Sequence, residues 1–95
     1  MHTYETCFIL KPNLTQSLKN EVISKIEDTI NKLGKIIETK NLGVKQLAYK
    51  INGYTHGEYV AYRMEFEEEK GQVKELEAYF RTLEDIIKFI IVKEN

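Results

Sequence analysis

The sequence of 95 residues has one cysteine, one proline, no tryptophan and no long apolar run. A single cysteine excludes an internal disulfide and fits a reducing compartment. The longest apolar run, Phe89 to Val92, is far shorter than the roughly 20 residues that span a bilayer. The first five residues lack the basic and apolar segments of a secretion signal. We therefore expect a cytoplasmic protein.

The chain also lacks an excess of charge of either sign, since fourteen Lys and Arg are balanced by fifteen Asp and Glu. A protein that holds nucleic acid through phosphates alone is usually basic, because each phosphate that it neutralises releases counterions and adds affinity. The near-neutral balance excludes this simple mode of binding. Any contact with RNA must be local, or shared with a second, basic protein.

Motifs for catalysis and for metal binding are absent as well. The two histidines and the cysteine, His2, His56 and Cys7, form none of the closely spaced pairs that converge on a metal ion. Nothing adjacent to Cys7 in the sequence would activate its thiol as a nucleophile. The sequence therefore predicts no catalytic residue, no metal site and no cofactor.

The first half of the chain alternates between strand and helix patterns. Residues 3–10 alternate in polarity, which predicts a strand. The next apolar residues recur three and four apart between Thr15, a good N-cap, and Gly34, which is typical of a helix end. Residues 35–51 then form one long predicted strand, with a bulge near residues 41–43. The apolar helix positions are Leu18, Val22, Ile26, Ile30 and Leu33.

A β-hairpin is predicted in the middle of the chain, with strands at 44–51 and 58–66 on either side of a turn that contains glycine. Basic and amide side chains alternate with apolar ones in the first strand, so one face can be core while the other meets a partner. We expect Tyr49 and Tyr62 to pack in the core and Tyr59 to be the best exposed candidate for stacking on a base. The polar positions are Lys45, Gln46 and Lys50, and the apolar ones are Leu47, Tyr49 and Ile51.

The rest of the chain predicts a second helix and a last strand, at 86–92. The helix pattern is carried by Val73, Leu76, Phe80 and Leu83. In the strand we expect Ile87, Phe89 and Ile91 on one side and Ile90 and Val92 on the other.

The resulting order, β-α-β-β-α-β, predicts one α+β domain over residues 1–95 with the ferredoxin-like fold. Both helices then cover one face of a four-stranded antiparallel sheet whose first and third strands are central. The other face stays open, as is common where a sheet binds another macromolecule. Alternation places Glu5, Cys7, Ile9, Tyr59, Ala61 and Arg63 on it.

Several blocks of the sequence resemble the bacterial small-subunit ribosomal protein S6 family. They are Tyr4-Glu5, Pro12-Asn13-Leu14, the continuous stretch from Leu42 to Ile51, Gly57-x-Tyr59, and Ile90-Ile91-Val92-Lys93. The Gly-x-Lys-x-Leu-Ala-Tyr-x-Ile block within the stretch is the most specific of them. The resemblance covers nearly the whole chain in the same order and spacing.

The resemblance implies a structural protein of the small (30S) ribosomal subunit with no catalytic activity. It would form a heterodimer with the small, basic ribosomal protein S18 and bind the central domain of the small-subunit ribosomal RNA, supporting subunit assembly and translation. A basic partner would also explain the near-neutral charge of this chain. Two alternatives stay open: a stand-alone reader of single-stranded RNA, and a ligand-regulated homodimeric domain.

Alternation and the resemblance together suggest the contact residues. For the ribosomal RNA, through phosphate and sugar, we expect His2, Lys45, Lys50, Arg81 and Lys93. For the protein partner, on the open side of the sheet, we expect Ile9, Tyr59, Ala61, Arg63 and Ile90.

Overall fold

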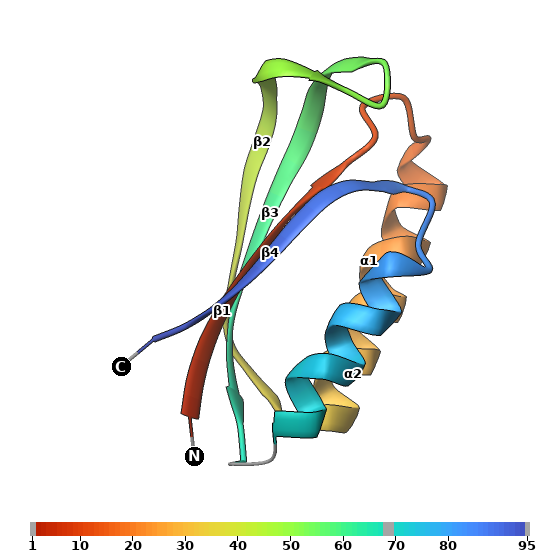
Figure 1. Ribbon diagram of the computed structural model, residues 1–95. Coiled ribbons are helices and arrows are strands. Elements are labelled where there is room, and N and C mark those ends of the chain that lie inside the picture. Colours follow the sequence, from red (N-terminus) through yellow and green to blue (C-terminus); the bar gives the residue numbers. More distant parts are fainter. Residues whose placement is uncertain (1, 68–69, 95) are drawn as a thin grey trace.

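The computed structural model describes residues 2–67 and 70–94. Its elements are β1 (His2–Leu10), α1 (Gln16–Leu33), β2 (Lys35–Ile51), β3 (Tyr54–Phe66), α2 (Lys70–Arg81) and β4 (Ile86–Lys93). The strands form one antiparallel sheet in the order β2-β3-β1-β4. Both helices cover the same face of it (Figure 1). The predicted ferredoxin-like α+β fold, with the first and third strands central, is confirmed. No described helix has the length and apolar character needed to cross a membrane.

The first helix begins and ends where its capping residues predict. The Thr15 hydroxyl accepts a hydrogen bond from the Leu18 amide at 3.2 Å, which satisfies one of the free N–H groups of the first turn. At the other end the Gly34 amide donates to the Ile30 carbonyl at 2.8 Å. Ile26 and Ile30 are fully buried against the sheet, as their spacing predicts.

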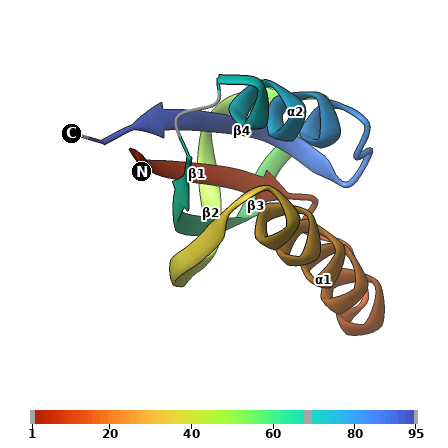
Figure 2. The same ribbon diagram turned by 90° about the horizontal axis from the view of Figure 1, so that it is seen from below.

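The main core lies between the two helices and the sheet. Phe8 of β1 packs against Tyr62 of β3 and Phe80 of α2, with ring centroids 5.7 and 5.6 Å away. Figure 2 shows the two helices side by side, with α2 nearer to β4. The Tyr62 hydroxyl donates to Glu27 of α1 at 2.9 Å. Burial, together with the Glu27 carboxylate, raises the pKa of Tyr62 far above its usual value. Core packing of Tyr62 is therefore confirmed.

Two element boundaries differ from the sequence prediction by more than one residue. The second helix ends at Arg81, before Leu83, although Leu83 still packs against the core. The third strand begins at Tyr54 rather than at residue 58. A two-residue turn with positive φ at Asn52 (51°) and Gly53 (84°) joins it to β2, so Ile51 and Tyr54 pair directly. An Asn-Gly pair is the usual sequence of such a turn.

The start of β4 also departs from simple alternation. Ile9 pairs with Lys88 and Leu10 pairs with Ile86, so Ile87 is an extra residue in its strand. This bulge turns Ile87 away from the helices, while Phe89 and Ile91 pack into the main core. The prediction that Ile87 shares a side with Phe89 and Ile91 is therefore wrong.

The far end of the β2–β3 hairpin extends past the ends of β1 and β4 and bends (top of Figure 1). There Leu47 packs with Ile9 and Ile87 in a second, small core on the side of the sheet away from the helices. Gly57 permits this packing, because a Cβ at that position would collide with the Ile9 side chain. The predicted open face is thus open over only part of its length.

A buried carboxylate holds β2 at its predicted bulge. Glu58 of β3 accepts hydrogen bonds from Lys19 of α1 at 2.9 Å and from Asn41 of β2 at 2.7 Å. Asn41 in turn accepts from the Gly43 amide at 2.8 Å, and Gly43 has a φ of 80°. Burial alone would raise the pKa of Glu58, but the two hydrogen bonds and the Lys19 charge outweigh it and lower that pKa. The network therefore fixes the point from which the hairpin extends.

Candidate functional site

The side of the sheet away from the helices, here called the free face, is built by side chains that lie in register across four strands. Each row runs in the order β2, β3, β1, β4. The rows are Glu38–Arg63–Glu5–Val92, then Lys40–Ala61–Cys7–Ile90, then Gly43–Tyr59–Ile9–Lys88. The free face therefore changes from charged near the chain termini to aromatic and apolar near the hairpin.

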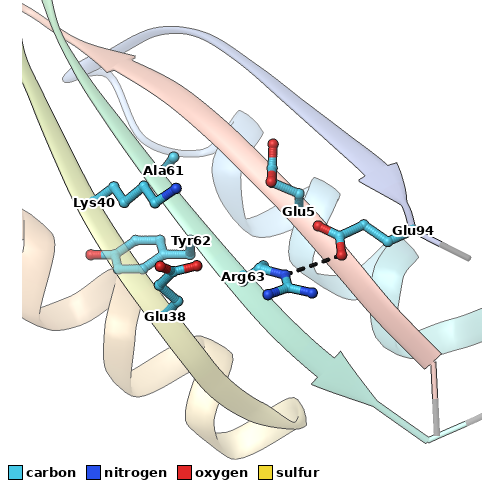
Figure 3. Close-up of a pocket in the computed structure, with 7 residues that line it drawn as sticks. All are labelled: Glu5, Glu38, Lys40, Ala61, Tyr62, Arg63 and Glu94. Carbon is cyan, nitrogen blue, oxygen red and sulfur yellow. Dashed lines mark hydrogen bonds and ion pairs between the residues drawn. The ribbon is translucent and has the colours of Figure 1, made fainter.

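The charged end of the free face contains a groove of about 260 Å³, shown in Figure 3. The Arg63 guanidinium donates from Nε to the Glu94 carboxylate at 3.1 Å across it. Three carboxylates and two cations line the groove, so its formal charge is negative. We call it the acidic groove; its charged residues are Glu5, Glu38, Lys40, Arg63 and Glu94.

The other end of the free face contains a second groove, of about 250 Å³, which we call the apolar groove. Its lining residues are Cys7, Ile9, Tyr59, Lys88, Phe89 and Ile90. Ile90 is 52% exposed, and Val92 beside the acidic groove is 53% exposed. Burial, and secondarily Glu5, raises the pKa of the Cys7 thiol, although Lys45 partly offsets this. Cys7 therefore stays a protonated thiol at neutral pH and contributes apolar surface.

The residues predicted to contact a protein partner lie together on the free face, but one of them, Ile9, is buried. Tyr59, Ala61, Arg63 and Ile90 are half-buried or exposed there. Ile9 is only 7% exposed, because the chain's own hairpin packs over it. It therefore belongs to the second core and offers little surface to a partner.

The residues predicted to contact RNA lie in three separate places. His2 and Lys93 are near the two chain ends, where the Glu94 amide donates to the Thr3 carbonyl at 2.8 Å. Lys45 and Lys50 are exposed on the hairpin. Arg81 ends α2 and pairs with Glu77 at 3.4 Å. These five residues do not form one site, and a ligand that touched them all would have to extend along the molecule (Figure 1).

An arrangement that sequence reasoning missed joins the hairpin to β4. Tyr49 is 65% exposed, so the prediction that it packs in the core is wrong. The Lys88 ammonium donates to the Tyr49 hydroxyl at 3.5 Å and lies 5.9 Å from the ring centroid. Similarly, the Lys45 ammonium lies 5.8 Å from the Tyr59 centroid. No local pattern signals the Tyr49–Lys88 contact, because the bend of the hairpin creates it.

Within residues 2–67 and 70–94, no three His, Cys, Asp or Glu side chains lie close enough together to hold a metal ion. The free face offers groups for noncovalent recognition: ion pairs in the acidic groove, apolar contact at Ile90 and Val92, and cation–aromatic pairs beside the hairpin.

Comparison with solved structures supports the fold. The chain superposes on the crystal structure of 30S ribosomal protein S6 from Thermotoga maritima with a TM-score of 0.91 and 23% identity, over 98% of this chain and 87% of that one. It also superposes on the C-terminal domain of the MgtC protein from Mycobacterium tuberculosis, with a TM-score of 0.59 and 8% identity, over 99% of this chain and 88% of that one. At these identities the likeness is one of fold.

Comparison of sequences is more specific. The chain is 41% identical to small ribosomal subunit protein bS6 of Helicobacter acinonychis, over 98% of this chain and 65% of that protein. It is 39% identical to bS6 of Nitratiruptor sp., over 98% of this chain and 72% of that protein. The chain thus spans about two thirds of the length of these relatives. Residues 3–93 match the family model described as ribosomal protein S6. This chain belongs to the ribosomal protein S6 family, a class of ribosomal structural proteins rather than of enzymes.

Proposed function

We propose that this chain is a structural component of the small ribosomal subunit in the cytoplasm. In this role it binds the central domain of the small-subunit ribosomal RNA as a heterodimer with ribosomal protein S18, and so supports subunit assembly and translation. The names of its relatives, small ribosomal subunit proteins, support the location. The role involves no catalytic step, because its chemistry is recognition by surface complementarity.

The free face carries the proposal. Its acidic groove has a negative formal charge, and the side chains of Val92 beside this groove and of Ile90 in the apolar groove are about half exposed. Such a surface suits a basic protein that also offers apolar side chains, because opposite charges steer the encounter and apolar burial supplies affinity. In this account Tyr59, Ala61, Arg63 and Ile90 contact S18.

The cations elsewhere support the RNA contacts. Lys45 and Lys50 are exposed on the hairpin, and no carboxylate within residues 2–67 and 70–94 forms an ion pair with either of them. Two separate lysines provide only part of the positive charge that an RNA junction requires. A basic partner seated on the acidic groove would supply the rest. Lys93, Arg81 and His2 would touch the RNA at other points along its path.

Charge reversal on the hairpin tests the RNA side of the proposal. Replacing both Lys45 and Lys50 with Glu should weaken binding of the heterodimer to the RNA by at least about tenfold at low salt. It should also lower the slope of log affinity against log salt by about two, one for each lost phosphate contact. The measurement is a filter-binding or calorimetric titration across a salt series.

The matched control replaces Lys32 of α1 and Lys74 of α2 with Glu. Both lysines are exposed, lie on the helical side and give the same change in net charge. The control should keep most of the affinity and the wild-type slope. If the two double variants lose the same affinity, the loss comes from the change in net charge alone. Lys45 and Lys50 are then not RNA contacts.

A further inference from the structure

The exposed ring of Tyr49 is held in place by a cation from the strand at the opposite edge of the sheet. β2, which carries Tyr49, and β4, which carries Lys88, are the two edge strands. The bent hairpin brings them together, so that Lys88 Nζ lies 3.5 Å from the Tyr49 hydroxyl and 5.9 Å from the ring centroid. Because Tyr49 remains 65% exposed, most of its surface stays open to solvent. The ring is thus positioned but not covered.

The surroundings of this ring are positively charged. Lys45 lies over Tyr59 at the border of the apolar groove, and Lys88 lines the same groove. In the described part of the chain no carboxylate forms an ion pair with Lys45, Lys50 or Lys88. The acidic groove lies at the other end of the same face. The hairpin end of the free face therefore favours an anionic ligand, whereas the acidic groove favours a cationic one.

An exposed aromatic ring beside exposed cations is the combination that binds single-stranded nucleic acid. The ring stacks on a base, and the cations bind the phosphates on either side of it. Lys88 uses one of its three donors on the Tyr49 hydroxyl, which leaves two for a phosphate. A ring that is already held in position loses little rotational freedom when a base stacks on it.

We propose that Tyr49 and Lys88 form a binding site for one unpaired nucleotide of the ribosomal RNA. The Tyr49 ring stacks on the base, Lys88 binds an adjoining phosphate, and Lys45 extends the phosphate path along the hairpin. The inference rests on the proposed function and adds to it a residue that recognises unpaired RNA. It also divides the free face between two ligands: RNA over Tyr49 and Lys88 where the hairpin meets β4, and the basic protein over the acidic groove and the adjoining Ala61, Tyr59 and Ile90.

The test uses the full chain with S18 and the central-domain RNA. Replacing Tyr49 with Ala should weaken RNA binding about tenfold or more, because one base loses its stacking partner. Replacing Tyr49 with Phe removes only the hydroxyl and should stay within about twofold of wild type. Replacing Lys88 with Gln should lower the salt slope by about one. Irradiation at 254 nm, followed by mass spectrometry, should cross-link the RNA to Tyr49.

Val44→Ala is the matched control, since Val44 is also an exposed apolar residue of β2, at 59%. It lies one residue out of phase with Lys45 and thus on the other side of the strand. It should bind RNA as wild type does. Circular dichroism of every variant checks that the fold is kept.

The outcomes separate this inference from the proposed function. If wild type binds RNA with S18 and Tyr49→Ala binds equally well with no cross-link at Tyr49, the nucleotide site is wrong and the proposed function stands. If Tyr49→Ala instead weakens binding to S18 in the absence of RNA, the cluster is a protein contact and the inference is also wrong. If wild type binds no RNA even with S18, the proposed function itself fails.

Discussion

Replacing Ile90 with Asp is expected to lower the affinity of this chain for S18 by about 100-fold while leaving the fold intact. Ile90 lies on β4 in the row with Cys7 and Ala61 and is 52% exposed, so the isolated chain tolerates a charge there. In the heterodimer the carboxylate would be buried among apolar side chains without a partner. Truncated or unpaired groups at the centre of an interface have effects of this size. Isothermal titration with purified S18 measures the change.

Leu18→Asp is the control for this prediction. Leu18 is 49% exposed, nearly the same as Ile90, but it lies in the first turn of α1 on the opposite side of the sheet. An acidic residue near a helix N-terminus is well tolerated, so this variant should bind S18 as wild type does. Equal affinities for Ile90→Asp and wild type would show that S18 does not bind over Ile90. The free face would then lose its central role in the proposal.

Replacing Gly34 with Ala is expected to destabilise the chain by about 3 kcal/mol. Gly34 ends α1, and a Cβ there would collide with the Glu65 carbonyl oxygen and with the ring of Phe66. Phe66 is fully buried, and a backbone carbonyl in the sheet has little room to move. The added methyl group must then push the end of α1 away from β3. We expect this to cost a free energy at the upper end of the usual range for overpacking. Thermal unfolding should show a melting temperature roughly 15 °C lower.

The control is the same substitution at Gly71. No atom lies within 4 Å of a Cβ built there, and Gly71 is in α2. Alanine favours a helix more than glycine does, so Gly71→Ala should stabilise the chain by about 0.5 kcal/mol. A Gly34→Ala variant as stable as wild type would show that Gly34 is a simple helix cap, not a site of close contact between α1 and β3.

Much of the fold could be predicted because its signals are local. Thr15 and Gly34 bracket a helix whose apolar residues recur three and four apart, and the alternation in β1 places Phe8 and Leu10 toward the helices. The order of elements then leaves few topologies. The Asn52-Gly53 turn was also a local signal, and taking it into account would have placed the start of β3 at Tyr54.

The features that were missed depend on contacts between distant segments. The bulge at Ile87 arises from the pairing of β4 with β1, which no pattern within β4 reveals. Tyr49 has the polarity of a core residue, but the bend of the hairpin leaves it exposed beside Lys88. The same bend buries Ile9. The error at Ile87 comes from applying alternation across a bulge, whereas the errors at Tyr49 and Ile9 come from the bend of the hairpin.

In the candidate site too, features with local signals could be predicted, and features that depend on distant contacts could not. Alternation and register were sufficient to gather Tyr59, Ala61, Arg63 and Ile90 on one face. By contrast, the residues proposed for RNA were chosen by type and by resemblance, and the structure places them in three regions. The charge that opposes Arg63 comes from Glu94, which is 31 residues away in sequence and was not foreseen.

In the proposed function this chain binds ribosomal RNA as one half of a pair with S18. The most direct test is binding of the purified chain to the central-domain RNA, with and without S18, across a salt series. We expect tight, salt-dependent binding only when both proteins are present. Equally tight binding by the chain alone would contradict it and favour an independent RNA reader. Absence of binding in both cases would contradict the RNA role altogether.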